Sequence, residues 1–499
     1  MLKLNKEKKF LLFLIVGLVI CIISYMRLFQ IFLDKEKDVS NLYTYKNFLL
    51  KYTKSPRLII EGGSNGHHSM DSLMFEKEFK MPTINLADNI AVPLKLKLTR
   101  LQKYATKGDI VIIPLGWHYF TAQNTSSSYF YEHILGGLKS YYTYTDTFDK
   151  FNILTHIQFS KFLYKLLDSN YFTSNREKKL NKLEILMNHI NKFKNNDRGD
   201  YYHGEVSIDN FLKKNPICDD YIFIRQIKNG FKVSNIFKQN MNFIKKLEKK
   251  GVKFIFTWPV VVGDDCYKSN FSNQIYSFRD NMAKYLNDYG FTLIGDIDKN
   301  NFPKKYIYDT YAHINSEARD IRTKKLIEDI KNSPYNRFFT NKGNSIEFKN
   351  NLNTLYSTLV EFLKPIKFDK EYLVSNNNLL YIGWCNKENW GVWSEGSRSE
   401  LVFKIDKKKI DKGFNLIIDS QIFASKDATE IVVNGKKIGL YILDGKNTIK
   451  IDKELIENDI IRVEFHHQNI KSPKELGINI DNRKIKLGLK SIKLTAFKK

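Results

Sequence analysis

The chain has 499 residues and a net charge of +26, from 80 Lys and Arg against 54 Asp and Glu, and this length predicts two or three folded units. It contains no tight Lys/Arg block, zinc-ligand spacing or RNA-binding signature, so nucleic acid is not an expected partner. The positive charge either attracts a polyanion such as an acidic glycan or lipid headgroups, or reflects a composition rich in lysine throughout.

An uncharged run from Phe10 to Met26 follows four lysines at the N-terminus. Residues 1–34 therefore predict a short cytoplasmic stub and one transmembrane helix, with Arg27 able to snorkel at its end. Lysines before the run favour a single span of the cytoplasmic (inner) membrane with the N-terminus in the cytoplasm. The bulk of the chain would then lie in the periplasm or outside the cell. A cleaved signal peptide is the alternative, although no small-x-small cleavage site follows the run.

Residues 35–345 alternate between strand and helix patterns after a polar, partly helical stalk at 35–55. The expected strands are 57–61, 83–86, 109–114, 253–257 and 291–294, and the expected helices are 70–79, 93–104, 233–249, 274–289 and 316–330, the last capped by Ser316. Buried apolar strands alternating with helices predict an α/β domain with a parallel sheet. Residues 121–230 interrupt this alternation and predict a helical insertion, with one helix near 178–193.

Residues 346–375 are expected to form a connector with a helix at 351–363, and residues 376–499 contain mostly strand patterns. The expected strands are 401–405, 415–418, 430–433, 448–451, 460–465 and 487–494. The pair Asn434-Gly435 between apolar runs is the strongest hairpin signal in the chain. Short strands at regular spacing predict a β-sandwich.

Ser64 follows a strand and two glycines and precedes a helix, a position that can present a hydroxyl at the carboxyl end of a sheet. Far downstream, Asp309 could orient the His313 ring, and His313 could act as a general base. Each feature also has a simpler interpretation: Ser64 as a helix-capping serine, and the Asp–His pair as a surface loop. His67 and His68 are closer in sequence and could line the site instead.

Several short motifs occur in a fixed order over roughly residues 56–330. They are 62–66 with 68–71, 84–87, 107–114, 251–259, and 308–314 followed by 322–323. This ordered set resembles the SGNH/GDSL hydrolase superfamily. It is most similar to the membrane-anchored branch that includes alginate O-acetyltransferase proteins and the D-alanyl transfer protein of teichoic acid synthesis.

The resemblance implies a three-layer α/β/α domain and a catalytic triad. Ser64 would be the nucleophile, His313 the base and Asp309 the residue that orients the base. The resemblance also implies oxyanion donors from the Ser64 N–H and from the segment 85–89. Ala87 occupies the position of the family's second-block glycine, and its N–H can still donate.

One departure from the family concerns the third-block asparagine, which is absent near Trp117. Asn65, Asn89 or His118 could take its place as an oxyanion donor. Trp117 and His118 are also expected to contact the substrate. Without a substitute donor the site would be slow or inactive.

Residues 383–396 are dense in tryptophan and glycine, and together with later motifs they resemble a β-sandwich module appended to bacterial glycosyltransferases and other surface-polysaccharide proteins. Trp384 and Trp390 are candidates for stacking on sugar rings, as is Trp393. The alternative, which we favour for at least two of the three, is that these rings pack in or at the edge of the sandwich core.

The combined expectation is a membrane-anchored O-acyl (acetyl) transferase that acts on a bacterial surface polysaccharide or its precursor. The alternatives are a carbohydrate esterase of the same fold and a non-catalytic glycan-binding or assembly protein. No metal or organic cofactor is expected. The resemblance implies a multi-span acyl-transferring membrane protein as partner, because a single span cannot move acyl groups across a membrane. A disulfide between Cys218 and Cys266 could form outside the cytoplasm.

Overall fold

The computed structural model describes residues 5–35, 42–116, 118–121, 130–131, 134, 142, 144–167, 198–201, 233–262, 272–340, 365–376, 379, 382–407, 410, 412–456, 459–481 and 483–497. Contacts divide the chain into two units, each described by itself below. The first comprises Met1–Thr44 with Asn124–Lys179, and the second comprises Tyr45–Gln123 with Leu180–Lys499. Trp117, Cys218, Cys266, the helices expected at 178–193 and 351–363, and most of the insertion lie outside the described residues.

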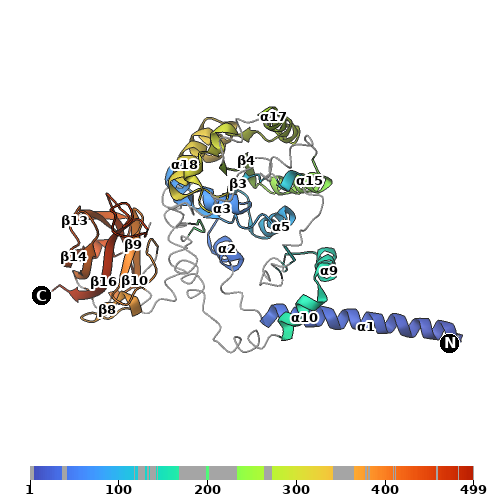
Figure 1. Ribbon diagram of the computed structural model, residues 1–499, viewed down its shortest axis with the longest axis horizontal. Coiled ribbons are helices and arrows are strands. Elements are labelled where there is room, and N and C mark those ends of the chain that lie inside the picture. Colours follow the sequence, from blue (N-terminus) through green and yellow to red (C-terminus); the bar gives the residue numbers. More distant parts are fainter. Residues whose placement is uncertain are drawn as a thin grey trace. The chain divides into compact units, whose positions relative to one another are not determined.

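The first unit contains a long apolar helix, α1 (Lys6–Lys35), together with α9 (Thr147–His156) and α10 (Phe159–Leu167) (Figure 1). The candidate span Lys6–Ile31 of α1 contains an 18-residue window with a mean hydropathy of 2.5, and none of that window is buried by the rest of the chain. The predicted apolar N-terminal helix is therefore confirmed, and it is apolar enough to be a single membrane span or a signal sequence.

The second unit contains a parallel sheet with the strand order β2-β1-β3-β4-β6. Its strands are β1 (Leu58–Ile60), β2 (Thr83–Asn85), β3 (Ile110–Pro114), β4 (Lys253–Thr257) and β6 (Leu293–Ile294). Ile59 pairs with Ile84 on one side and with Val111 on the other. β1, β2 and β3 are buried along their whole length, because a parallel sheet is covered on both faces.

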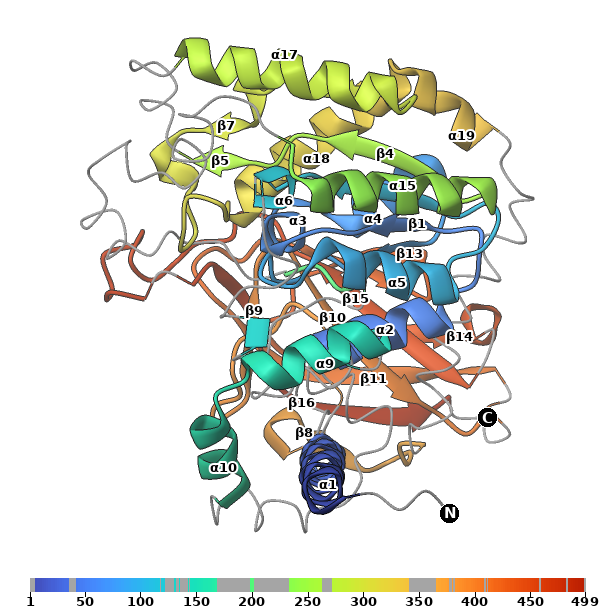
Figure 2. The same cartoon turned by 90° about the vertical axis from the view of Figure 1, so that its right-hand side faces the viewer.

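Helices cover both faces of this sheet, with α5 and α15 on one side and α4 and α18 on the other (Figure 2). The helices of this unit are α2 (Leu42–Tyr52), α3 (Ser64–Ser69), α4 (Ser72–Phe79), α5 (Leu94–Tyr104), α6 (His118–Thr121), α15 (Asn235–Lys249), α17 (Ser272–Asp288), α18 (Ser316–Lys331) and α19 (Arg337–Thr340). Phe75 of α4 and Leu326 of α18 share a core with Ile60 and Ile112 of the sheet. The predicted mixed α/β architecture with a parallel sheet is confirmed.

Local differences from the expected elements have identifiable causes. The helix expected at 70–79 begins at Ser72, because the Asp71 side chain accepts the Met74 N–H and caps it. The cap of α18 is Asn315 rather than Ser316, since the Asn315 side chain accepts the Ala318 N–H. The stalk expected at 35–55 contains α2, which packs Tyr45 and Leu49 into the fold.

Several very short elements were not predicted. A two-residue parallel pair joins β5 (Val261–Val262) to β7 (Asn301–Phe302). Single-turn 3-10 helices lie at Asp298–Asn300, Lys304–Tyr306, Pro334–Asn336, Val374–Asn376 and Lys453–Leu455. Elements of two or three residues carry too few side chains to form a detectable period.

The C-terminal part of the second unit is an antiparallel β region of two sheets. The strands are β8 (Glu371–Leu373), β9 (Val392–Glu395), β10 (Arg398–Lys404), β11 (Gly413–Ile422), β12 (Thr429–Val433), β13 (Lys436–Tyr441), β14 (Gly445–Asp452), β15 (Ile460–His466) and β16 (Ile485–Ala496). One sheet has the order β10-β15-β12-β13, and the other has the order β14-β11-β16-β8 with β9 paired to β16. Apolar side chains from both sheets form one core, which confirms a separate antiparallel β region.

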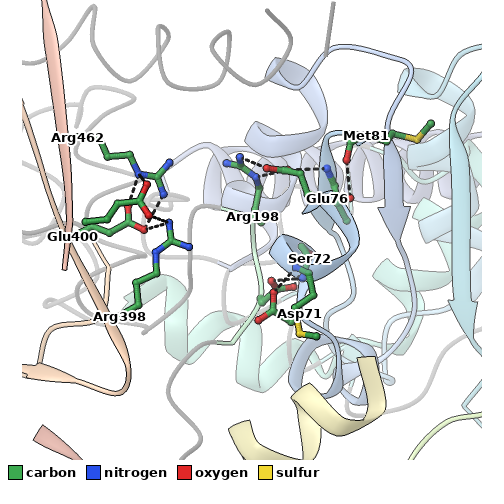
Figure 3. A network of polar contacts seen from close by, with 12 residues as sticks. Asp71, Ser72, Glu76, Met81, Arg198, Arg398, Glu400 and Arg462 are labelled. Carbon is green, nitrogen blue, oxygen red and sulfur yellow. Dashed lines mark hydrogen bonds and ion pairs between the residues drawn. The ribbon is translucent and has the colours of Figure 1, made fainter. Parts of the chain in front are cut away.

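The hairpin predicted at Asn434-Gly435 joins β12 to β13, where Val433 pairs with Lys436. Asn434 has φ 47° and Gly435 has φ 80°, the left-handed conformation that two-residue turns of this kind require. Within the same sheet, the buried carboxylate of Glu400 accepts two hydrogen bonds from Arg462, at 2.6 and 2.8 Å (Figure 3). This paired arrangement makes burial of the charge tolerable.

The β region is predicted to lose stability on mild acidification because of His467. Burial first, and then the charges of His466 and Lys486, lowers the pKa of His467 to about 3. The unfolded chain binds a proton on this ring below about pH 6.5, whereas the folded state does not, so lowering the pH from 7 to 5 should cost about 2 kcal/mol. Urea titrations followed by tryptophan fluorescence at both pH values measure this loss. His467→Gln should reduce the difference in unfolding free energy between pH 7 and pH 5. If this difference is the same in the variant, His467 is not its cause.

Candidate functional site

Ser64 lies at the point where the sheet changes its direction of winding. In a sheet with this strand order, the crevice outside the carboxyl ends of β1 and β3 is the usual place for a ligand. Ser64 follows β1 after three residues and is the first residue of α3. The first N–H groups of a helix have no acceptor within that helix. Ser64 is half-buried and begins α3 just beyond the carboxyl end of β1, at the edge of the sheet where ligands usually bind in folds with this strand order.

Two glycines allow α3 to approach the strand ends closely. A Cβ atom at Gly66 would lie 2.9 Å from the Ala87 Cβ and 3.0 Å from the Pro114 Cγ, and a Cβ at Gly63 would lie 3.0 Å from the Ile90 Cβ. A larger residue would push α3 away from β2 and β3. The glycines thus hold the serine turn against the sheet.

The Asn65 side chain joins the serine turn to two distant segments. Its amide group donates to the carbonyls of Val260 at 2.8 Å and Ala312 at 2.9 Å, and its oxygen accepts the Val260 N–H at 3.0 Å. Ala312 directly precedes His313. The residue next to Ser64 therefore fixes the loop that carries the predicted imidazole.

His313 and Asp309 form a hydrogen bond of 2.6 Å between Nδ1 and Oδ1. A carboxylate only accepts, so the Nδ1–H donates, which leaves Nε2 of the neutral ring as an acceptor. The His313 side chain is 14% exposed and that of Asp309 is 36% exposed. The pair has the internal geometry that a general base and its orienting carboxylate require.

His68 stacks on His313 rather than taking its place. The two rings are 4.0 Å apart with an interplanar angle of 12°. Burial, followed by the positive charge of nearby basic groups with His313 first among them, holds the pKa of His68 well below its usual range. A neutral His68 presents a flat face to His313 without charge repulsion. Because Ser64 and His68 are four residues apart, they lie on the same side of α3.

The segment 198–201, which belongs to the expected insertion, is held against α4 and β2. Arg198 forms two hydrogen bonds of 2.9 Å with Glu76 (Figure 3). The Asp200 carboxylate accepts from Ser72 and Asn85. These contacts place the Tyr201 ring 4.5 Å from His68. Sequence reasoning missed this neighbour, because no local pattern links residue 201 to residue 68.

The hydroxyl of Tyr201 lies 2.8 Å from the hydroxyl of Tyr308, whose ring also stacks near His68. His68, Tyr201 and Tyr308 therefore form an aromatic wall beside His313. Its members come from three segments that are far apart in the sequence.

Two of the expected oxyanion donors, the Ala87 N–H and the Asn65 amide, are engaged elsewhere. The Ala87 N–H donates to the Ile60 carbonyl at 3.1 Å and to the Asn85 side chain at 3.0 Å. The oxyanion role predicted for Ala87 is therefore not supported, because its N–H already donates to these two acceptors and holds the end of β2 beside β1. The Asn65 amide donates to the carbonyls of Val260 and Ala312. For Asn89, the side-chain oxygen accepts the Ala91 N–H, a contact in which Asn89 is the acceptor and not the donor.

A buried network of charged side chains holds the serine turn, residues 61–64, which leads from β1 to Ser64. Glu61, which directly precedes the two glycines, accepts from Arg100 at 2.7 Å and from the Gly62 N–H at 3.1 Å. Arg100 also lies 3.7 Å from Asp88, which pairs with Lys97, and all four side chains are fully buried. The Asp88 N–H donates to the Gly62 carbonyl. The network thus fixes both sides of the turn that leads to Ser64.

The predicted aromatic contacts of the β region are mostly packing contacts. Trp384 is 7% exposed, belongs to the core and donates its indole N–H to the Glu400 carbonyl. This burial corrects the predicted sugar-stacking role of Trp384. Trp390 and Trp393 are half-buried and contact each other, with ring centroids 5.1 Å apart.

Trp117 lies outside the described residues, and for His118 only the backbone, in α6, is described. Among the described residues, no group of three or more His, Cys, Asp or Glu side chains could hold a metal ion.

No protein-family model and no curated protein sequence matches this chain. A match to an acetyl xylan esterase from the rumen bacterium Butyrivibrio proteoclasticus has 18% identity and a TM-score of 0.18, and covers 26% of this chain and 32% of that chain. A carbohydrate-binding module solved with calcium and xylotriose matches at 8% identity and a TM-score of 0.17, over 25% of this chain and 99% of the module.

A cycloisomaltooligosaccharide glucanotransferase from Paenibacillus sp. matches at 8% identity and a TM-score of 0.16, over 51% of this chain and 47% of that chain. At these identities and TM-scores, the three similarities establish neither a shared fold nor an activity.

Proposed function

We propose that this chain is a membrane-anchored O-acyl transferase of SGNH-like fold that acts on a sugar hydroxyl of a bacterial surface polysaccharide or its precursor. The observation that carries the proposal is the set of hydrogen bonds from the Asn65 side chain to Val260 and Ala312. It ties the loop of the Asp309–His313 pair to the residue that follows Ser64. A serine at the start of a helix, a histidine whose Nε2 can accept a proton and an orienting carboxylate are the groups that acyl transfer through a serine ester needs.

In the proposed reaction, the Ser64 hydroxyl attacks the acyl carbonyl of a donor while the Nε2 atom of His313 accepts the hydroxyl proton. The bond between the acyl carbon and the donor oxygen then breaks, and His313 returns the proton to the leaving oxygen. The acceptor sugar hydroxyl repeats these steps on the serine ester and releases Ser64. The Ser64 N–H at the start of α3 is the proposed donor to the oxyanion.

The compartment and partner belong to the same proposal. With α1 as a single span and the lysines before it in the cytoplasm, the α/β and β regions would face the periplasm or the cell exterior. An acyl donor would then have to be supplied across the membrane by a multi-span protein.

The deciding experiment distinguishes transfer from hydrolysis. The detergent-solubilised chain is incubated with an acetyl donor and an acceptor oligosaccharide, and ester on the oligosaccharide and free acetate are both measured. Net gain of ester supports a transferase, whereas release of acetate alone means that water is the acceptor and the chain is an esterase. If a folded chain forms neither oligosaccharide ester nor free acetate, the acyl-transfer proposal is wrong, and a glycan-binding or assembly role is the alternative that remains.

His68 is predicted to position the His313 ring through its stacking face. His68→Ala should lower kcat by about 10- to 100-fold, because small displacements of a catalytic base have large effects on rate. His68→Phe retains a flat ring and should keep most of the activity. Initial rates at saturating substrate, with thermal unfolding as a control for folding, test this. Equal losses in both variants would mean that the imidazole nitrogen, rather than the ring face, is required.

A further inference from the structure

We propose that α9 and α10 lie on the membrane surface beside the end of α1, with their exposed apolar side chains inserted among the lipid headgroups. This inference rests on the proposed role of α1 as a membrane span. It adds a lipid-contacting surface, formed by residues 147–167, to a chain for which only the span itself was expected.

The first argument is the position of α9 and α10 along α1. Tyr25 and Phe29, near the C-terminal end of the apolar part of α1, contact the ring of Phe162 at 5.5 and 5.6 Å, and Tyr25 also contacts Phe159 at 5.8 Å. The Tyr25 hydroxyl donates to the Leu154 carbonyl. Figure 2 shows α10 beside α1 within this unit.

The second argument is depth. The uncharged part of α1 begins at Phe10, directly after lysines that would remain at the membrane surface. Residues 10–29 of a helix span about 30 Å, which is the thickness of the hydrocarbon core, and Arg27 lies close enough to the end of this stretch for its charge to reach the headgroups. Phe29 is therefore expected at the opposite membrane–water boundary. The aromatic cluster around it occupies the level at which membrane proteins gather aromatic side chains.

The third argument is the unusual exposure of apolar side chains on both helices. The exposed residues are Phe148 (71%), Phe151 (51%), Phe159 (59%), Leu163 (39%), Tyr164 (76%) and Leu167 (68%). In α10, the residues Phe159, Leu163 and Leu167 recur at four-residue intervals on one side, whereas Lys161 lies on the opposite side. A short helix with an apolar face and a lysine face is typical of the bilayer interface.

Depth-dependent quenching in proteoliposomes tests the proposal on the full chain. Phe159→Trp places a new fluorophore on the apolar side of α10, and Lys161→Trp places one on the opposite side as a matched control. The emission of the five native tryptophans is subtracted using the unchanged chain. Lipids brominated near the headgroup should quench the tryptophan at position 159 at least about threefold more than the one at position 161.

Equal and weak quenching at both positions would overturn the proposal. A blue-shifted but unquenched emission at position 159 would also overturn it, because a protein rather than lipid would then cover this face. Alkaline carbonate extraction of the unchanged chain tests the anchor separately. If the chain remains in the membrane while position 159 is unquenched, only the surface contact is wrong. If carbonate releases the chain, the proposed span itself is wrong.

Discussion

Ser64→Ala is expected to lower the rate of acyl transfer or ester hydrolysis by about 10⁴-fold or more, while the fold remains intact. The serine hydroxyl is the only proposed site for the covalent ester, and loss of the nucleophile leaves little beyond oxyanion stabilisation and substrate binding. The change removes a single oxygen atom from a half-buried position at the start of α3. Product formation under single-turnover conditions, together with circular dichroism, measures both effects.

Ser69→Ala in the same helix is the matched control. The Ser69 side chain is completely buried and, among the described residues, its hydroxyl has no hydrogen-bond partner. The same chemical change at this position should leave the rate nearly unchanged. If Ser64→Ala retained the rate of the unchanged chain, the serine-ester mechanism would be wrong. A similar loss in both variants would instead indicate damage to α3.

Arg100→Met is expected to destabilise the α/β fold by about 3–5 kcal/mol, because it leaves buried carboxylates without their cation. Glu61 would lose its 2.7 Å partner, and Asp88 would lose one of its two nearby positive charges. For a domain of this size, such a loss lowers the midpoint of thermal unfolding by roughly 10 °C. Thermal unfolding followed by circular dichroism at neutral pH measures the change.

Lys284→Met provides the comparison at the surface. Lys284 pairs with Asp288 at 3.5 Å on α17, but the two side chains are 77% and 63% exposed. Exposed pairs of this kind contribute at most about 1 kcal/mol, so the unfolding midpoint should hardly move. An Arg100→Met protein as stable as Lys284→Met would show that the buried network does not support the serine turn.

Much of the architecture could be predicted because it depends on local patterns. The apolar run 10–26 needs no tertiary partner to be recognised, and it appears within α1. Alternating apolar and amphipathic segments predicted each strand of the parallel sheet, and the turn at Asn434-Gly435 predicted its hairpin, because two-residue turns demand these residue types. Most element boundaries moved by only one or two residues.

The polar contacts of the site could not be predicted in the same way. The Ala87 N–H, expected to serve an oxyanion, is taken by the Ile60 carbonyl of a neighbouring strand. Trp384 has the residue type that binds sugars, but the surrounding sheets bury it. In both cases the competing partner comes from a segment that no local pattern identifies.

The sequence by itself determined the strands of the parallel sheet and most of the helices that cover it, and that Ser64, Asp309 and His313 are the candidate residues. Periodicity, turn chemistry and residue type act within a few neighbouring positions, and a single chain contains that information directly. Only the tertiary structure decided that Asn65 ties the serine turn to Ala312, that His68 stacks on His313, and that Tyr201 joins them. These contacts connect positions far apart in the chain, and they exist only because the parallel sheet and its helices bring those positions to one edge.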